Sequence, residues 1–158
     1  MTLIVVFAKI VKAGEVNLYA LNQRFKESTA QDPEMLAVKG KLLSTVEFYA
    51  DGQIALVVVT AEMLELYRNK TNLAVLVFYD MLNTRGVKLA VVMNEYPNLI
   101  RTSMRAKLEV AGPIAEHFGG GGHPMAAAFP TPERTIADLK PEFIEYAAKV
   151  IASVKTNQ

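Results

Sequence analysis

The chain has 158 residues, about the length of one domain, and 51% of them are hydrophobic, which is enough for a core of useful size. Its formal net charge is +1, so binding to a polyanion would need a local cluster of cations. The absence of cysteine excludes disulfides, thiolate catalysis and cysteine-ligated metal sites. Nothing in the sequence indicates secretion, so we expect a cytoplasmic protein.

An apolar run near the N-terminus, residues 3–8, is continuous rather than alternating, which is typical of a segment buried on all sides. It is too short to span a bilayer, and Lys9 and Lys12 follow it, the reverse of the order in a secretory signal. It is either an internal strand or a segment that has lost its natural cover. We assign residues 1–12 to a linker or inter-domain segment and residues 13–158 to one domain.

Helical patterns and one hairpin are predicted in the first half of the chain. A helix over residues 15–25 is followed by a second one that begins near Pro33, a favoured first-turn residue. Strands over 45–49 and 53–59 flank a turn at Asp51-Gly52. Thr60 is placed to cap a short helix, residues 61–67.

The second half is predicted to contain a strand pair between helices. Residues 71–82 are ambiguous between strand and helix, and their length and the cap-like Thr71 favour a helix. Strands over 87–93 and 99–105 surround a turn at 94–98. The later helices carry their apolar stripes at Val110, Ile114 and Phe118, and then over residues 139–154, with Pro141 near the start. The fold class is therefore α/β, a single domain with a mixed sheet of about five strands and helices packed on it.

Four consecutive glycines, Gly119 to Gly122, precede His123 and Pro124. One glycine suffices to end a helix, and each further glycine costs conformational entropy. The run makes sense if backbone N–H groups must approach another body closely. Proline favours a first helical turn, so we expect a short helix from His123-Pro124 through Ala128, with its positive end beside the glycines. A phosphate is the natural occupant, and His123 can donate a hydrogen bond to it.

An arginine-bearing strand precedes this run. Side chains alternate across a strand, so Arg101, Ser103 and Arg105 share one face. Two arginines and a hydroxyl on one face suit phosphate capture and stacking on bases. The plainer alternatives are a loose glycine loop, arginines on the solvated face of an edge strand, and a His117 that is merely solvated. The coincidence of three features within residues 101–128 favours a phosphate- or nucleotide-binding site.

These residues also carry a family resemblance. Residues 100–105 (with Ser103-Met104-Arg105), 110–118 and 119–128 (with Gly120-Gly121-Gly122-His123) resemble the C-terminal, DHH-associated domain of the DHH phosphoesterases. They are closest to the branch of bifunctional oligoribonucleases (nanoRNases) and pAp phosphatases. Shorter pieces at residues 21–22, 42–45 and 52–55 resemble the same branch, so the likeness covers about residues 11–129.

The resemblance implies a substrate-binding role. In such enzymes an N-terminal DHH domain holds two manganese ions, and the C-terminal domain closes over it and grips the nucleotide. By analogy Gly120, Gly121, Gly122 and His123 would approach the substrate phosphate. Arg105 and Arg101 would hold the terminal phosphate or base, and Ser103 would assist.

The sequence departs from the family pattern in two ways. Ala128 stands where the family usually has glycine, which puts close backbone packing there in doubt. No Asp-x-Asp or Asp-His-His occurs, and the two histidines, His117 and His123, do not follow an aspartate. A two-metal site cannot be built from these residues. We therefore expect no catalytic residue, metal ligand or cofactor in this chain, an absent DHH domain that would hold the manganese, and no turnover by the chain alone.

The leading functional hypothesis is a phosphate-binding domain of a manganese-dependent DHH phosphoesterase that hydrolyses short oligonucleotides or pAp. The expected partners are RNA or DNA oligonucleotides or pAp, a DHH domain in cis or trans, and a second copy that covers an exposed N-terminal apolar segment; no membrane partner is expected. The alternative is a nucleic-acid-binding module without hydrolase function, as in RecJ-type exonucleases and alanyl-tRNA synthetases. A structural domain without a ligand is a third reading, which we rank lowest.

Overall fold

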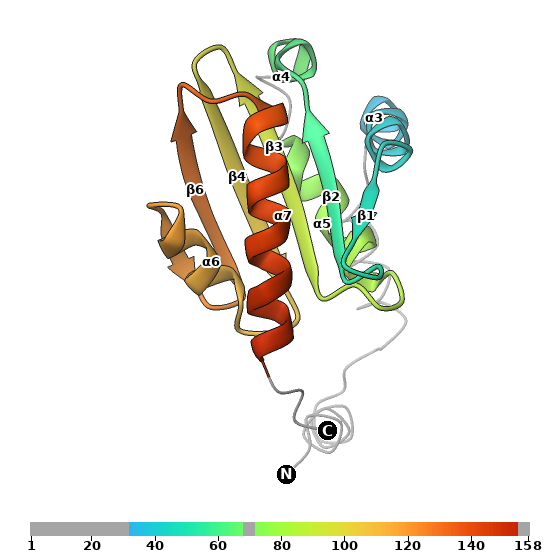
Figure 1. Ribbon diagram of the computed structural model, residues 1–158. Helices are drawn as coiled ribbons and strands as arrows, with labels where there is room; N and C mark the ends of the chain where they lie inside the picture. The colour runs from blue at the N-terminus through green and yellow to red at the C-terminus, as the bar shows by residue number, and fades with distance from the viewer. Residues whose placement is uncertain (1–31, 68–71, 155–158) are drawn as a thin grey trace, which may run out of the picture. The chain divides into compact units, whose positions relative to one another are not determined.

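The computed structural model describes residues 32–67 and 72–154 (Figure 1). Contacts divide the chain into two units, Met1–Ala37 and Val38–Gln158. Of the first unit only residues 32–37 are described, which include the first turns of helix α3 (Pro33–Leu43). The apolar run 3–8, the predicted helix 15–25 and the proposed boundary after residue 12 lie outside the described residues.

The second unit is an α/β domain built on one mixed sheet. Its strands are β1 (Glu47–Tyr49), β2 (Ile54–Val59), β3 (Leu89–Tyr96), β4 (Leu99–Ala106), β5 (Gly121–His123) and β6 (Ala126–Pro132). They are ordered β1-β2-β3-β4-β6-β5, with β2 and β3 parallel and every other pair antiparallel. The sheet thus has six strands, close to the predicted number of about five. Four of them were predicted, β5 comes from the glycine run, and β6 comes from a segment whose first residues were predicted to be helical.

Helices lie on both faces of this sheet. They are α4 (Ala61–Tyr67), α5 (Leu73–Asn83), α6 (Ala111–His117) and α7 (Ile136–Ser153), in addition to α3. The main core lies under α6 and α7, where alternate residues of the strands, such as Met104 and Phe129, meet Phe143 of α7. Figure 1 shows α7 running along that face, with α5 behind the sheet. Helix α5 covers part of the opposite face, where it contacts β2, β3 and β4.

Local signals account for most of these elements. Helix α3 begins at Pro33 as predicted, and β1 and β2 form the predicted hairpin around Asp51-Gly52. The Met63 N–H contacts Thr60 Oγ1 at 3.4 Å at the start of α4. The ambiguous segment 71–82 is a helix, but its cap is Asn72, whose Oδ1 accepts from the Ala74 N–H at 3.1 Å.

A small polar cluster ties the edge strand β1 to α7. Lys140 Nζ donates to both carboxylate oxygens of Glu47, at 2.9 and 3.0 Å, and the Tyr49 hydroxyl donates to the same carboxylate. The hydrogen bonds from Tyr49 and Lys140 lower the pKa of Glu47 from its ordinary 4.5. The hydrogen bond to Glu47 raises the pKa of Lys140 above 10.5. The folded state therefore favours the charged form of both groups.

This cluster predicts a modest pH dependence of stability. The contribution of Glu47 to the free energy of unfolding is complete above pH 4.5 and is lost as the pH falls through its lowered folded pKa. The contribution of Lys140 is complete below pH 10.5 and is lost as the pH rises through its raised folded pKa. Because both side chains are partly exposed, we expect Lys140→Met to cost at most about 1 kcal/mol at pH 7. Urea unfolding at pH 7 and pH 3 tests this: the difference from wild type should shrink in acid, and an equal difference at both pH values would contradict it.

Candidate functional site

The three predicted residues of β4 lie on the side of the strand that faces away from the main core. Arg101 and Arg105 are exposed and Ser103 is half-buried, whereas Thr102 and Met104 between them are fully buried. Strand β4 lies between β3 and β6. The alternative of a solvated edge strand is therefore wrong: these arginines project from the interior of the sheet, on a face left open beside α5.

The register extends this face across β6 to β5. Ser103 pairs with Ala128, which pairs with Gly121; Arg105 pairs with Ala126, which pairs with His123. Directly paired residues share a face of a sheet. We call the surface formed by Arg101, Ser103, Arg105, Ala126, Ala128, Gly121 and His123 the arginine face. With strands about 4.8 Å apart, the backbones of Arg105 and His123 are about 10 Å apart.

Two of the predicted glycines, Gly120 and Gly122, do not belong to this face. A Cβ on Gly120 would lie 2.3 Å from the Ala128 carbonyl oxygen, and a Cβ on Gly122 would lie 2.7 Å from the Ala127 Cα. Gly122 has φ +146° and Gly119 has φ +78°, conformations that L side chains rarely adopt. The fold itself therefore requires three of the four glycines, because β5 lies tightly against β6 and the chain must turn out of α6.

Gly121 is different. A Cβ on Gly121 would meet nothing within 4 Å, and its φ is not in the left-handed region. It is exposed and lies on the arginine face, opposite Ala128. Neither packing nor backbone conformation requires glycine here, and the missing side chain leaves open space on the arginine face.

The predicted helix from His123-Pro124 through Ala128 is wrong. Pro124 and Met125 form the turn of the β5–β6 hairpin, and Ala126 begins strand β6. Helix propensity of three alanines is a weak preference, and pairing with β4 on one side and β5 on the other overrides it. No helix therefore begins at residues 123–128 beside the glycine run.

Backbone N–H groups nearby are also used within the protein. The N–H groups of Ala111 and Gly112, at the start of α6, donate to the Pro124 carbonyl at 2.8 and 3.3 Å. The Gly120 N–H donates to Ala115 O at 2.8 Å. The Gly120 N–H is thus used inside the protein, and the helix expected over residues 123–128 is a turn and a strand, so its dipole is absent. What lies beside Gly121 is a set of side chains on an open sheet.

His123 has a defined hydrogen-bonding state at this edge. Its Nδ1 accepts a hydrogen bond from the Met125 N–H at 3.2 Å, so in the neutral ring the hydrogen is on Nε2. The side chain is exposed on the arginine face. The neutral imidazole therefore has a free donor, Nε2–H, on the same face as Arg105 and Gly121.

The two arginines differ in how they are held. Arg105 Nη1 donates to the Met104 carbonyl at 2.8 Å, and its guanidinium lies 5.2 Å from the Phe78 ring centroid on α5. Arg101 is exposed. Within residues 32–67 and 72–154 neither arginine has an ion pair with a carboxylate. Their positive charge therefore remains available to an anion from outside.

Residues 53–153, more than half of the chain, match the DHHA1 domain family. The chain belongs to the DHHA1 domain family. A comparison of the sequence with curated proteins gave no significant match.

Solved structures support the fold of this DHHA1 domain. An exopolyphosphatase-related protein from Bacteroides fragilis superposes with a TM-score of 0.72 and 18% identity, over 92% of this chain and 42% of its own. A pGpG-specific phosphodiesterase from Vibrio cholerae gives a TM-score of 0.50 and 14% identity, over 88% of this chain and 52% of its own. The chain thus spans about half or less of the length of these structures, and the likeness concerns the fold.

The sequence analysis missed two residues of the DHHA1 domain beside the arginine face. The predicted turn at 94–98 is too long: β3 continues through Tyr96, and the turn is Pro97-Asn98. Asn94 pairs with Arg101 and is 7% exposed, with its Oδ1 buried and unpartnered in the described structure. Tyr96 is 40% exposed on the same side. The apolar pattern of β3 ends at Met93, and only continued pairing with β4 reveals the last three residues of the strand.

Alanine at position 128, where the resemblance leads one to expect glycine, does not prevent close packing of the backbone. The Gly120 backbone lies against the Ala128 carbonyl, while the Ala128 methyl projects onto the arginine face between Ser103 and Gly121. The methyl groups of Ala126 and Ala128 form a surface of small side chains between the β4 arginines and strand β5.

His117, predicted to be solvated, is exposed and stacks on Tyr146 with ring centroids 3.6 Å apart.

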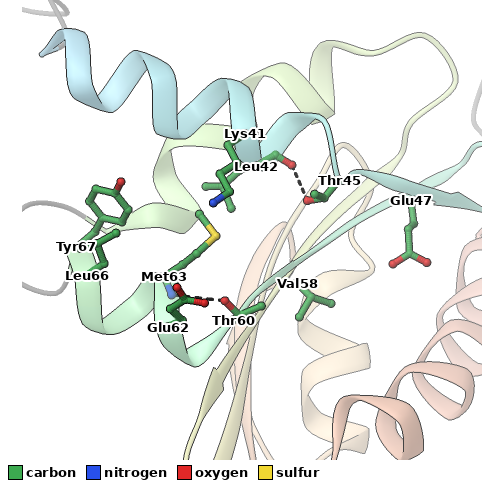
Figure 2. Close-up of a pocket in the computed structure, with 10 residues that line it drawn as sticks. All are labelled: Lys41, Leu42, Thr45, Glu47, Val58, Thr60, Glu62, Met63, Leu66 and Tyr67. Carbon is green, nitrogen blue, oxygen red and sulfur yellow. Dashed lines mark hydrogen bonds between the residues drawn. The ribbon is translucent and has the colours of Figure 1, made fainter.

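Other features of the described residues do not suit a phosphate. In the described parts of the chain no three His, Cys, Asp or Glu residues lie together as a metal site would need, and no helix is long and apolar enough to cross a membrane. A cavity of about 380 Å³ lies beside β2 between α3 and α4 (Figure 2). Its charged lining residues are Lys41, Glu47 and Glu62, so carboxylates outnumber cations there.

Proposed function

We propose that this DHHA1 domain binds the phosphate groups of nucleotides or short oligonucleotides through its arginine face. One observation carries the proposal: two arginines without carboxylate partners in the described structure, a serine hydroxyl and the Nε2–H of His123 share an open face with the unobstructed Gly121. Arginine contacts phosphate through two parallel hydrogen bonds, and the small residues between the donors leave room for the group. The names of the two structural relatives also refer to substrates with phosphate linkages.

The domain would serve a larger phosphoesterase by binding and positioning its substrate. A DHH catalytic domain, in the same polypeptide or another, would supply manganese ions and the hydrolytic chemistry, with short oligoribonucleotides or pAp as substrates. The described residues do not fit a metal ion, so their own contribution would be to hold the phosphate in one orientation. This chain by itself is expected to bind without hydrolysing.

Titration with a 5′-phosphorylated RNA trinucleotide and with pAp tests the proposal. Arg105→Ala and His123→Ala should each weaken binding by about tenfold, because a hydrogen bond to a charged group contributes about 1.5 kcal/mol or more. Lys149→Ala is the matched control, since this exposed lysine lies on α7, which covers the opposite face of the sheet.

The salt dependence provides a second readout. Affinity should fall as salt rises, and the slope of log affinity against log salt should become shallower in Arg105→Ala but not in Lys149→Ala. Equal weak binding by wild type, Arg105→Ala and His123→Ala would remove the site. Binding that depends on these residues, combined with no effect of a DHH domain on turnover, would favour a nucleic-acid-binding module without hydrolase function.

A further inference from the structure

We propose that the arginine face binds a single strand of at least two nucleotides laid along β4, with a base stacked on Tyr96. This inference rests on the proposed function and names its ligand more closely. It assigns Tyr96 as a residue that selects oligonucleotides over mononucleotides.

The two arginines are too far apart for one phosphate. Arg101 and Arg105 are four residues apart on one strand, a backbone separation of about 13 Å at 3.3 Å per residue. Arg105 cannot simply swing toward Arg101, because its guanidinium is held by the Met104 carbonyl and lies over Phe78. With each guanidinium above its own position on β4, a ligand that uses both cations carries phosphate groups at separate positions along the strand.

Tyr96 extends the same face beyond Arg101. In the β3–β4 register Asn94 pairs with Arg101 and Tyr96 pairs with Leu99, so Tyr96 is the diagonal neighbour of Arg101. Diagonal neighbours lie about 7–8 Å apart, a distance that allows one nucleotide to place its phosphate at Arg101 and its base over the tyrosine ring. Pro130, exposed on β6 opposite Arg101, lies beside this path.

The tyrosine ring is available for stacking. Tyr96 is 40% exposed, and within the described residues its ring has no aromatic partner and its hydroxyl has no hydrogen bond. Stacking on an aromatic ring tolerates any base, because every base has a π-face. The face therefore combines phosphate contacts at His123, Arg105 and Arg101 with a base platform at Tyr96, as a short single strand requires.

Affinity as a function of ligand length tests this inference. We would measure the Kd of 5′-phosphorylated adenosine mono-, di- and trinucleotides for wild type, Tyr96→Ala, Tyr96→Phe, Arg101→Ala and Phe48→Ala. The trinucleotide should bind wild type at least about tenfold more tightly than the mononucleotide. Tyr96→Ala should weaken trinucleotide binding by about tenfold and leave mononucleotide binding unchanged, while Tyr96→Phe retains the ring and the affinity.

The other variants separate stacking from charge and from general surface effects. Arg101→Ala should lower trinucleotide affinity by a larger factor than mononucleotide affinity. Phe48→Ala, an exposed aromatic on β1 three strands away, should change neither. Equal affinity for all ligand lengths, or an equal loss for all lengths in Tyr96→Ala, would overturn the inference. Mononucleotide binding that depends on Arg105 and His123 would still support the proposed function. No nucleotide binding by wild type would overturn both.

Discussion

Gly120→Ala is expected to destabilise the domain by about 3 kcal/mol, because overpacking against atoms that cannot move is among the costlier substitutions. The new Cβ would lie 2.3 Å from the Ala128 carbonyl oxygen and 2.6 Å from the Phe129 Cα. Both are backbone atoms of β6, which pairs with β4 and β5. Relief would require separation of β5 from the sheet. Urea unfolding followed by circular dichroism measures the loss.

Gly121→Ala should give the opposite combination. Its Cβ meets nothing within 4 Å, so the free energy of unfolding should stay within about 0.5 kcal/mol of wild type. Binding of the 5′-phosphorylated trinucleotide should weaken, because the methyl group would occupy the open face beside Ala128 and His123. Gly40→Ala in α3 is the control for a glycine in open space: it should stabilise slightly and leave binding unchanged.

These glycine variants separate the structural part of the run from its binding part. A stable Gly120→Ala protein would show that the hairpin does not need the close approach of β5 and β6. A Gly121→Ala protein with wild-type affinity would show that the open space at this position has no role in binding. The expected pattern is one glycine substitution that lowers stability and one that lowers affinity.

Phe129→Ala is expected to cost about 3–5 kcal/mol, the range for truncation of a buried aromatic side chain. Phe129 is 1% exposed on the core side of β6. Its ring stacks on Phe118, with centroids 4.7 Å apart, and contacts Phe143 of α7 at 6.0 Å. The substitution would leave a cavity where the end of α6, the sheet and α7 meet. Thermal or urea unfolding measures the change.

Phe48→Ala provides the comparison for this prediction, since Phe48 is 52% exposed on β1. It should change the free energy of unfolding by no more than about 0.5 kcal/mol. Similar losses for the two phenylalanine variants would mean that the aromatic cluster is not the centre of stability. Phe129→Leu should recover part of the stability, because it restores much of the apolar volume.

Much of this domain follows from local sequence. Pro33 and Thr60 lie at the predicted starts of α3 and α4, because capping and proline chemistry act within one turn. Helix α7 starts earlier than its proline indicates: Thr135 caps it, and Pro141 lies inside the helix. The alternation Ile100, Thr102, Met104 against Arg101, Ser103, Arg105 predicts which face of β4 is buried, and the burial pattern confirms it. The residue types of the proposed site are likewise visible in the sequence, since glycine, histidine and arginine have distinct conformational and hydrogen-bonding properties.

Tertiary structure decided what those residues do together. Residues 126–128 have a helical preference, but hydrogen bonding to β4 and β5 makes them a strand, since pairing on both sides outweighs a propensity of a few tenths of a kcal/mol per residue. The same pairing turns Gly120 and Gly122 toward the interior of the hairpin and leaves Gly121 on the arginine face. The sequence by itself determined the faces of single elements, whose periods are local; the register between distant strands determined which faces meet, and so brought Tyr96, Arg101, Arg105 and His123 onto one surface.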